Sequence, residues 1–258
     1  SSCTFNGNVT TLNWYNAEEF DVVYTFSNSD TEGILVFELT FIDSAGNQGD
    51  TVITSTNNSY IIFDMTTPAD FTVGDVSATG GNEIATFWNS TNTGIDILVP
   101  IDSDSTLDSG RVQMWGKVGS NPFESIGDYV FIESEEVGDI KTMSLIEDSV
   151  EALTGYTEDD TLFFKAVIYD IPGNETEGST STTILLIDET PPSLISASYE
   201  SNFSDSSLAT VGHVVTLTFE TDVEIQTPSA TISTQNAIIS DLGSNQWSAS
   251  YEMQDSDT

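Results

Sequence analysis

The sequence predicts an all-β fold of several small antiparallel sandwiches joined in a row. Three observations predict it. Apolar and polar residues alternate along many short segments, and clusters of Gly, Asn, Asp and Ser separate these segments at roughly 8- to 12-residue intervals. Parts of the chain also repeat one another. With 38% hydrophobic and 10% aromatic residues, the chain has enough apolar surface to build cores.

Three segments show the alternation of a half-buried strand most clearly: GILVFELTFID (33–43), TLFFKAVIYD (161–170) and HVVTLTFETDVEI (213–225). One face of each strand is therefore expected to point into a core. The expected inward-facing residues are Leu35, Phe37, Leu39 and Phe41 in the first strand, Leu162, Phe164, Ala166 and Ile168 in the second, and Val215, Leu217 and Phe219 in the third.

One segment predicts a helix instead. SLIEDSVEALTGY (144–156) carries Leu145, Val150 and Leu153 at near-helical spacing, and Ser144 precedes them as a candidate N-cap. We expect one short helix between strands at this place.

Internal repeats predict the domain organisation. FIDSAGN (41–47) aligns with IYDIPGN (168–174), and each is followed by a Thr/Ser-rich stretch. The two stretches then end alike, on IIFDMTTP (61–68) and LLIDETPP (185–192). The predicted divisions are 1–66, the C-terminal part of a sandwich; 67–190, a complete sandwich; and 191–258, the N-terminal part of a sandwich.

A second repeat links the two ends of the sequence. Residues 2–31 align without gaps on residues 229–258, so that Thr4 falls on Thr231 and Tyr24 falls on Tyr251. Two partial domains are therefore expected, because each holds a different share of one repeating unit. Two ways of completing them stay open: neighbouring sequence of a longer array, or strands from a neighbouring copy that joins head to tail.

The charge balance excludes two classes of partner. The chain holds 42 acidic residues against 4 basic ones, a formal net charge of −38, so we expect neither nucleic acid nor anionic lipid to bind. No apolar run reaches the ~20 residues of a membrane helix. The self-repulsion of such a chain fits either salty surroundings or bound Ca²⁺, and both interpretations stay open.

Acidic residues beside turns and prolines are candidate Ca²⁺ ligands, since this ion takes six to eight oxygens from carboxylates, carbonyls and water. The alternative is that they form ordinary Asx turns and solvated loops. Candidates at the domain ends are Asp43, Asp64, Asp170, Asp188 and Glu189, and a D-x-D loop, whose spacing departs from the EF-hand pattern, adds Asp102, Asp104 and Asp108.

The sequence carries no recognisable catalytic motif, so we expect no enzymatic activity. His213 is the single histidine, and no nucleophile elbow, phosphate-cradling loop or zinc-protease motif occurs. Exposed tryptophans would offer binding instead, because their rings can stack on sugars. Trp88 and Trp115 are candidate contacts for a cell-surface glycan, whereas the alternation around Trp247 predicts a core position.

The segment TPPSLISASYESNFSDSSLATVGHVVTLTFETDVEIQTPSATI (190–232) resembles the bacterial Ig-like repeats of very large cell-surface adhesins. The middle domain keeps the D-x-x-G-N turn of that family, but its first half is closer to a fibronectin-type or another Ig-like variant. The matching elements are Pro191 with Pro192, Val211–Phe219, Ile225–Ile232, Trp247–Tyr251, Ser29–Gly33 and Asp43–Asn47.

The resemblance implies tandem Ig-like (Greek-key) β-sandwiches in an elongated array, located outside the cell or on its surface. It implies a structural stalk or filament of an adhesin, non-enzymatic, with Ca²⁺ as a cofactor at the junctions and adjacent repeats or neighbouring copies as head-to-tail partners. Two alternatives stay open. One is a self-assembling filament subunit that exchanges strands with its neighbours, and the other is a carbohydrate-binding module.

Overall fold

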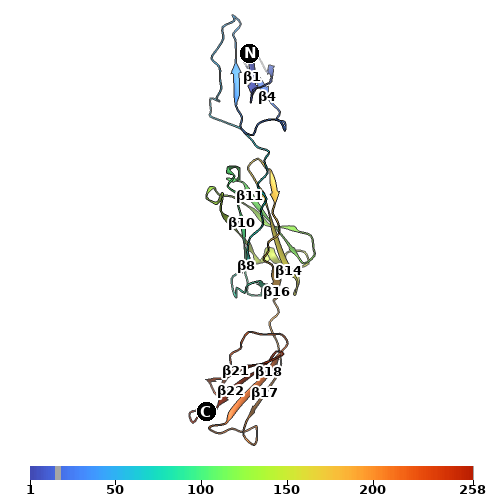
Figure 1. Cartoon of the computed structure of the whole chain (residues 1–258), viewed down its shortest axis with the longest axis vertical. Coiled ribbons are helices and arrows are strands. Elements are labelled where there is room, and N and C mark those ends of the chain that lie inside the picture. The colour runs from blue at the N-terminus through green and yellow to red at the C-terminus, as the bar shows by residue number, and fades with distance from the viewer. Residues whose placement is uncertain (15–18, 258) are drawn as a thin grey trace. The chain divides into compact units, whose positions relative to one another are not determined.

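A computed structural model of the chain describes residues 1–14 and 19–257. The described chain is predominantly β, and its sheets are almost entirely antiparallel, which confirms the all-β prediction (Figure 1). It divides into two compact units, 1–188 and 189–258. The further boundary near residue 66 stays a prediction.

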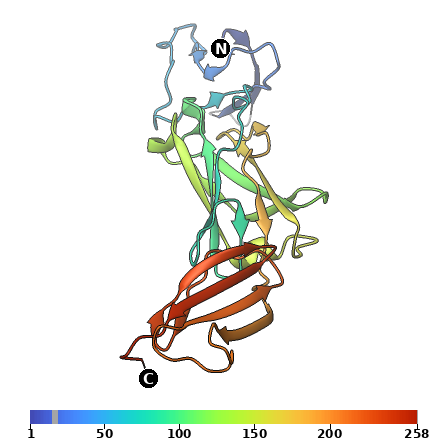
Figure 2. The ribbon, with the colours of Figure 1, turned by 60° about the horizontal axis from the view of Figure 1, so that its bottom comes forward.

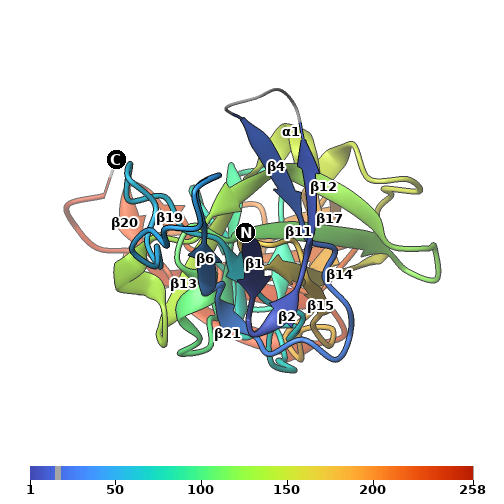
Figure 3. The same ribbon diagram turned by 90° about the horizontal axis from the view of Figure 1, so that it is seen from above.

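Residues 1–66 form three small sheets with the pairings β2-β1-β6, β3-β4 and β5-β7. Figure 3 labels β1, β2, β4 and β6 of this segment. Burial is slight, because Cys3 is the one fully buried hydrophobic residue among the described residues of this segment. The strands are β1 (Ser2–Phe5), β2 (Asn8–Val9), β3 (Thr11–Trp14), β4 (Phe20–Val23), β5 (Gly33–Ile34), β6 (Phe37–Thr40) and β7 (Ile62–Phe63).

Residues 67–188 form two sheets that enclose one core. One sheet has the order β13-β10-β8, and the other has the order β12-β11-β14-β16-β9 with β15 added on β14. The elements are β8 (Val76–Thr79), β9 (Phe87–Trp88), β10 (Gly94–Pro100), η1 (Ser105–Leu107), β11 (Arg111–Val118), β12 (Glu124–Phe131), η2 (Ser134–Glu136), β13 (Ile140–Ile146), α1 (Glu147–Glu151), β14 (Thr161–Tyr169), β15 (Glu175–Glu177) and β16 (Leu185–Ile187).

Strand β14 supplies the centre of that core. Leu162, Phe164 and Ala166 have no exposed surface and Ile168 is 2% exposed, so the alternation predicted for this strand is confirmed. They belong to one cluster with residues of β8, β10, β11, β13 and β16, which means that both sheets contribute to a single packed interior.

The predicted helix is present, but its predicted cap is wrong. Helix α1 begins after Ile146, and Val150 and Leu153 bury their side chains in the core. Ser144 instead continues strand β13, where its hydroxyl donates a hydrogen bond to Asp96 Oδ1 at 2.6 Å. The helix starts at Glu147, so its N-cap position falls on Ile146, the last residue of β13, and Ser144 lies two residues too early to cap it.

Residues 189–257 form a four-stranded sheet of order β17-β18-β22-β21 and a small β19-β20 hairpin (Figure 2). Trp247 is 7% exposed, which confirms the core position predicted for it. Strand β17 is exposed along almost its whole length. The strands are β17 (Leu194–Ser201), β18 (Val214–Thr221), β19 (Thr231–Ile232), β20 (Gln235–Asn236), β21 (Ile238–Gly243) and β22 (Gln246–Glu252).

The two aligned segments at the ends of the sequence make the same strand pairings in the same register. Hairpin β1-β2 corresponds to β19-β20, and hairpin β3-β4 corresponds to β21-β22. The matching pairs are Thr4–Val9 and Thr231–Asn236, Phe5–Asn8 and Ile232–Gln235, Thr11–Val23 and Ile238–Ser250, Leu12–Val22 and Ile239–Ala249, Asn13–Asp21 and Ser240–Ser248, and Trp14–Phe20 and Asp241–Trp247.

Candidate functional site: an apolar groove and an open strand edge

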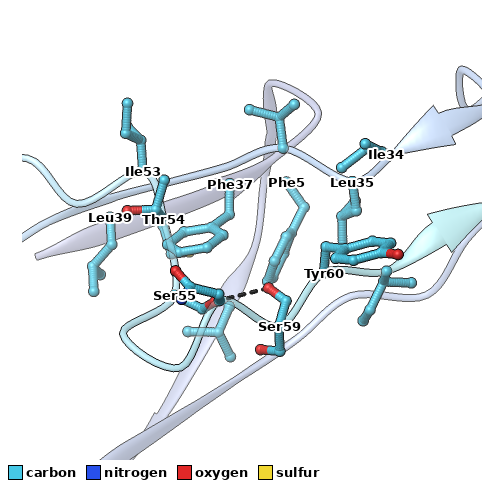
Figure 4. Close-up of a pocket in the computed structure, with 15 residues that line it drawn as sticks. Phe5, Ile34, Leu35, Phe37, Leu39, Ile53, Thr54, Ser55, Ser59 and Tyr60 are labelled. Atoms are coloured by element: carbon cyan, nitrogen blue, oxygen red, sulfur yellow. Dashed lines mark hydrogen bonds between the residues drawn. The ribbon is translucent and has the colours of Figure 1, made fainter.

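Residues 1–66 carry an apolar groove of about 580 Å³. Figure 4 shows side chains from several elements pointing into it. Strands β1, β4, β5 and β6 and the segment 53–61 supply its lining. The main apolar contributors are Phe5, Val22, Leu35, Phe37, Leu39 and Ile53.

The groove follows from the predicted alternation in 33–43. Leu35, Phe37 and Leu39 are half-buried and line it, as expected for one face of a strand, while Phe41 lies beyond the end of β6 and is 40% exposed. The expectation that Phe41 continues the inward face is therefore wrong. Phe41 lies in the hairpin that leads to the Asp43 turn, and its ring lies against Gly49 instead of the groove.

A hydrogen-bonded loop closes one side of the groove. Ser55 Oγ donates to the carbonyl oxygen of Ser59 at 2.7 Å (Figure 4). The amide of Ser59 donates to Asn57 Oδ1 at 3.1 Å. Tyr60 follows this loop at the groove and is 68% exposed. Hydrogen bonds within residues 55–59 therefore hold this side of the groove in place, and the ring of Tyr60 faces solvent.

Strand β4 runs beside the groove with one open edge. Among the described residues it pairs only with β3, whereas its counterpart β22 pairs with β21 on one side and β18 on the other. Val22 of β4 lines the groove and is half-buried, while the corresponding Ala249 of β22 has no exposed surface. The difference between the two copies is the neighbouring strand.

Both copies of the repeat end in the same tyrosine–aspartate contact. The hydroxyl of Tyr24 donates to Asp30 Oδ1, and at the aligned positions the hydroxyl of Tyr251 donates to Asp257 Oδ1 at 3.3 Å. The bond from Tyr24 lowers the pKa of Asp30, and the same bond raises the pKa of Tyr24. Burial, and then Asp257, raises the pKa of Tyr251. The contact fixes the chain directly after β4 and after β22.

Two of the candidate Ca²⁺ ligands hold their own turns. Asp43 Oδ1 accepts the amide of Asn47 at 2.7 Å and Oδ2 accepts its side-chain amide at 2.8 Å, which lowers the pKa of Asp43. Asp170 accepts the same two groups of Asn174 at the same two distances, 2.7 and 2.8 Å. These bonds are those of the Asx-turn interpretation.

The Asp170 turn lies against the segment that leads into the middle sandwich. Asn174 Nδ2 donates to the carbonyl oxygen of Asp64 at 3.3 Å, so the structure places the Asp170 turn next to the backbone of Asp64. Asp64 Oδ1 accepts the amide of Thr66 at 2.9 Å, while Asp64 Oδ2 is buried without a hydrogen-bond partner. This oxygen is the one feature here that fits a cation.

The remaining candidate ligands lie elsewhere in the chain. Asp188 ends one compact unit, and Glu189 begins the other. In the loop of 102–108, Asp104 caps η1 by accepting the amide of Thr106 at 2.9 Å, while Asp102 is exposed and Asp108 follows the helix. In the described part of the chain, no three acidic, histidine or cysteine side chains converge.

The two candidate tryptophans differ. Trp88 has no exposed surface, and its indole N–H donates to the hydroxyl of Tyr156 at 2.7 Å, so the expectation that this ring is exposed is wrong. Trp115 lies half-buried on β11, with the ammonium of Lys165 at 5.6 Å from its ring centroid. Its own N–H is buried without a hydrogen-bond partner.

Three of the four basic residues lie against aromatic rings of β11, β14 and their surroundings. The Arg111 guanidinium lies 4.4 Å from the centroid of Tyr169, and the Lys117 ammonium lies 4.8 Å from that of Phe163. The fourth, Lys141, is buried and bonds Glu136 at 2.6 Å. The rings of β14 come from a distant part of the chain, so the local pattern around Trp115 does not indicate these contacts.

The groove has the chemistry of a polypeptide-binding surface. Apolar side chains can bury a partner's apolar face, and the backbone of β4 can pair with an added strand.

None of the helices in the described ranges is long and apolar enough to cross a membrane. No protein-family model and no curated protein matches this chain.

Proposed function

We propose that this chain is a non-enzymatic structural segment of an extracellular surface protein, built from tandem Ig-like sandwiches. The observation that carries the proposal is the repeated strand register of 2–23 and 229–250. One strand pattern used twice in one chain is typical of proteins assembled from copies of a module. A module that serves reach and stiffness needs a closed core and a soluble surface, and no reactive cleft.

The middle sandwich has the properties that a load-bearing module needs. Its core cluster draws on both sheets, and the contacts of Asn174 with Asp64 and of Thr176 with Pro68 hold the incoming chain against it. In the second contact the Thr176 hydroxyl donates to the Pro68 carbonyl oxygen at 2.5 Å. Such bonds reduce the freedom of the linker, which favours a stiff connection.

Calcium at this junction is part of the proposal. Asp64 Oδ2 supplies one unpartnered carboxylate oxygen, and backbone carbonyls and water would have to supply most of the others. The bound ion would offset part of the net charge of −38 and restrain the linker.

Thermal unfolding at low salt tests the calcium part. We expect a higher melting temperature with Ca²⁺ than with chelator, and a smaller rise with Mg²⁺ at the same ionic strength. Asp64→Asn should remove the difference between the two ions, because it removes the free carboxylate. Coincident melting curves in Ca²⁺ and in chelator would contradict a calcium site.

The structural role itself is tested on the native polypeptide. A tandem array predicts an intact mass several times that of 258 residues, with further copies of the repeated pattern in its sequence. A native chain of about this length, active on a substrate, would contradict the proposal.

A glycan-binding module is the second candidate function, and Trp115 is the observation that favours it. The ring lies on the same strand as Arg111 and Lys117, which could bind acidic sugars. Fluorescence titration with neutral and acidic sugars tests this, with Trp115→Phe as the variant that should lose the response. Trp88 is buried and should stay silent, so a signal that survives the substitution would contradict the candidate site.

A further inference from the structure

We propose that the groove and the open edge of β4 form a docking site for the β17-β18 hairpin of a second copy of this chain. The inference rests on the repeated module of the proposed function and adds a partner to it. Residues 1–66 and residues 189–257 would then meet across two molecules, with one copy donating a hairpin and the other receiving it.

The aligned copy in 189–257 indicates which strand would pair with the open edge of β4. In 189–257 the edge of β22 that corresponds to it is covered by β18, in an antiparallel ladder from Val214 to Glu220. Transferring this register from β22 to the aligned residues of β4 places β18 beside β4. The pairs in the structure are Val215–Tyr251, Leu217–Ala249 and Phe219–Trp247, and the corresponding pairs between copies are Val215–Tyr24, Leu217–Val22 and Phe219–Phe20.

The docked strand would turn its apolar face into the groove. Val22 lines the groove, so a residue that pairs with Val22 on the same face points there as well. That residue is Leu217, with Val215 and Phe219 two positions away on the same face. Leu217 and Phe219 are only half-buried in their own unit, so they have apolar surface left to bury.

One strand of the hairpin, β17, is an exposed edge of its sheet, whereas β18 is held between β17 and β22. In the described part of the chain β17 pairs only with β18, and its residues Ile195 and Tyr199 are 60% and 66% exposed. Moving the hairpin exchanges the seven-pair ladder of β18 with β22 for a ladder with the four-residue strand β4, so one strand edge opens in the donor while another closes in the receiver. The gain must therefore come from apolar burial, because Leu217 and Phe219, half-buried in their own unit, would meet the apolar lining of the groove.

Charge sets the expected salt dependence. Glu220 pairs with Gln246 in its own unit, and the residue that corresponds to Gln246 in the other copy is Glu19. Docking places these two carboxylates opposite each other, on chains that already repel one another. Association should therefore strengthen as salt increases, which is the opposite of a contact held by ion pairs.

Disulfide trapping between full-length chains tests the register. Thr218 pairs with Ser248 in its own unit, so docking brings it opposite Asp21, and paired Cα atoms lie within the span of a disulfide. We would mix Asp21→Cys chains with Thr218→Cys chains, both carrying Cys3→Ala, which is the residue at the corresponding position 230. The expected product is a 1:1 disulfide-linked pair.

Val9→Cys is the matched control, because Val9 is 82% exposed but lies on β2, away from the proposed edge. Mixed with Thr218→Cys chains, it should cross-link at least tenfold more slowly. Equal rates for the two mixtures would overturn the proposed register.

Sedimentation of the otherwise unmodified chain tests the association. We expect concentration-dependent oligomers that grow with NaCl, and dissociation by an excess of a peptide spanning residues 193–224. Glu19→Lys should tighten association about fivefold, since it turns a repulsive cross-strand pair into an attractive one. A chain that stays monomeric at all salt concentrations overturns the second copy as donor, even if the peptide binds. That result leaves the structural role standing, because a tandem array needs no exchange between copies.

Discussion

The middle sandwich and the segments on either side of it use similar strands but bury very different amounts of apolar surface. Between residues 73 and 187, a cluster of 24 buried hydrophobic residues forms one core. Among the described residues, Cys3 is the only fully buried hydrophobic residue of 1–66, and 189–257 has four: Val215, Ile232, Trp247 and Ala249.

The difference shows that alternation alone does not make a core. An alternating strand supplies one apolar face, and a second sheet must cover it. In 67–188 two sheets face each other, so Phe164 is fully buried. In 1–66 the strands leave a groove, and Ile34 and Ile53 remain 62% and 61% exposed. Stability should therefore be concentrated in the middle sandwich, and association in the flanking segments.

The largest predicted effect contrasts a core residue with a groove residue. Phe164→Ala should lower the free energy of unfolding of the middle sandwich by about 3–5 kcal/mol, because it leaves a cavity in a closed core. Ile53→Ala removes a side chain of residues 1–66 that is 61% exposed, and it should change the free energy of unfolding of that segment by at most about 0.5 kcal/mol. Urea unfolding at a protein concentration too low for association measures both. Similar losses for the two variants would contradict the contrast.

The features that the sequence could predict are those set by a local pattern, and the features that it missed depend on distant strands. Alternation sufficed for β14 and for Trp247, because burial on one face of a strand is a local pattern. It failed for Trp88, which sits in β9, a two-residue strand whose parallel partner β16 lies far along the chain. The cap predicted at Ser144 failed because β13 continues to Ile146 beside the distant strand β10, so the helix starts two residues later than that cap requires.

The candidate site was predictable only in part. The alignment of 2–31 with 229–258 is visible in the sequence, and the alternation of 33–43 indicates an apolar face. The openness of the groove is not visible, because it depends on which strand lies beside β4. The turn role of Asp43 and Asp170 was one of two open interpretations, and the hydrogen bonds of their carboxylates now describe it.

The two D-x-x-G-N turns compare the same hydrogen-bonded turn in buried and in exposed surroundings, and the expected loss of stability is the next largest. Asp170 is 2% exposed, and its carboxylate accepts the amides of Gly173 and Asn174, so Asp170→Ala should cost about 2–3 kcal/mol by leaving buried donors unpaired. Asp43 makes the same kind of turn in exposed surroundings, where water can replace the carboxylate. Asp43→Ala should therefore cost clearly less. Hydrogen exchange of β14 and β6 measures the two losses separately, and a greater loss for Asp43 would contradict the burial argument.

A smaller effect is expected at the bond between Trp88 and Tyr156. Tyr156→Phe keeps the ring but removes the acceptor, so the buried indole N–H of Trp88 loses its partner. We expect a loss of about 1–2 kcal/mol. Tyr60→Phe is the control, because Tyr60 is 68% exposed and should give no measurable change. If both variants unfold like the wild type, the indole N–H must find another acceptor.

The smallest effect is a pH dependence confined to the end of β4. The pKa of Asp30 is lowered from its ordinary value of 3.8, chiefly by the hydroxyl of Tyr24 and then by the amide of Ser27. A carboxyl with a lower pKa in the folded state binds fewer protons there than in the unfolded state. Its contribution to stability is therefore complete above pH 3.8 and is lost as the pH falls through the folded value.

The wild-type chain and the Asp30→Asn variant should thus differ in stability by a constant amount near neutral pH, and the difference should shrink as acid protonates Asp30. Hydrogen exchange of the Ser27 amide, which donates to Asp30 Oδ2 at 2.6 Å, measures this locally. Acid also relieves the repulsion among the 42 acidic residues, but that gain is nearly the same in both chains and cancels in the difference. A difference that grows in acid would mean that the protonated form of Asp30 makes the stronger contact, and that the carboxylate does not hold the segment after β4.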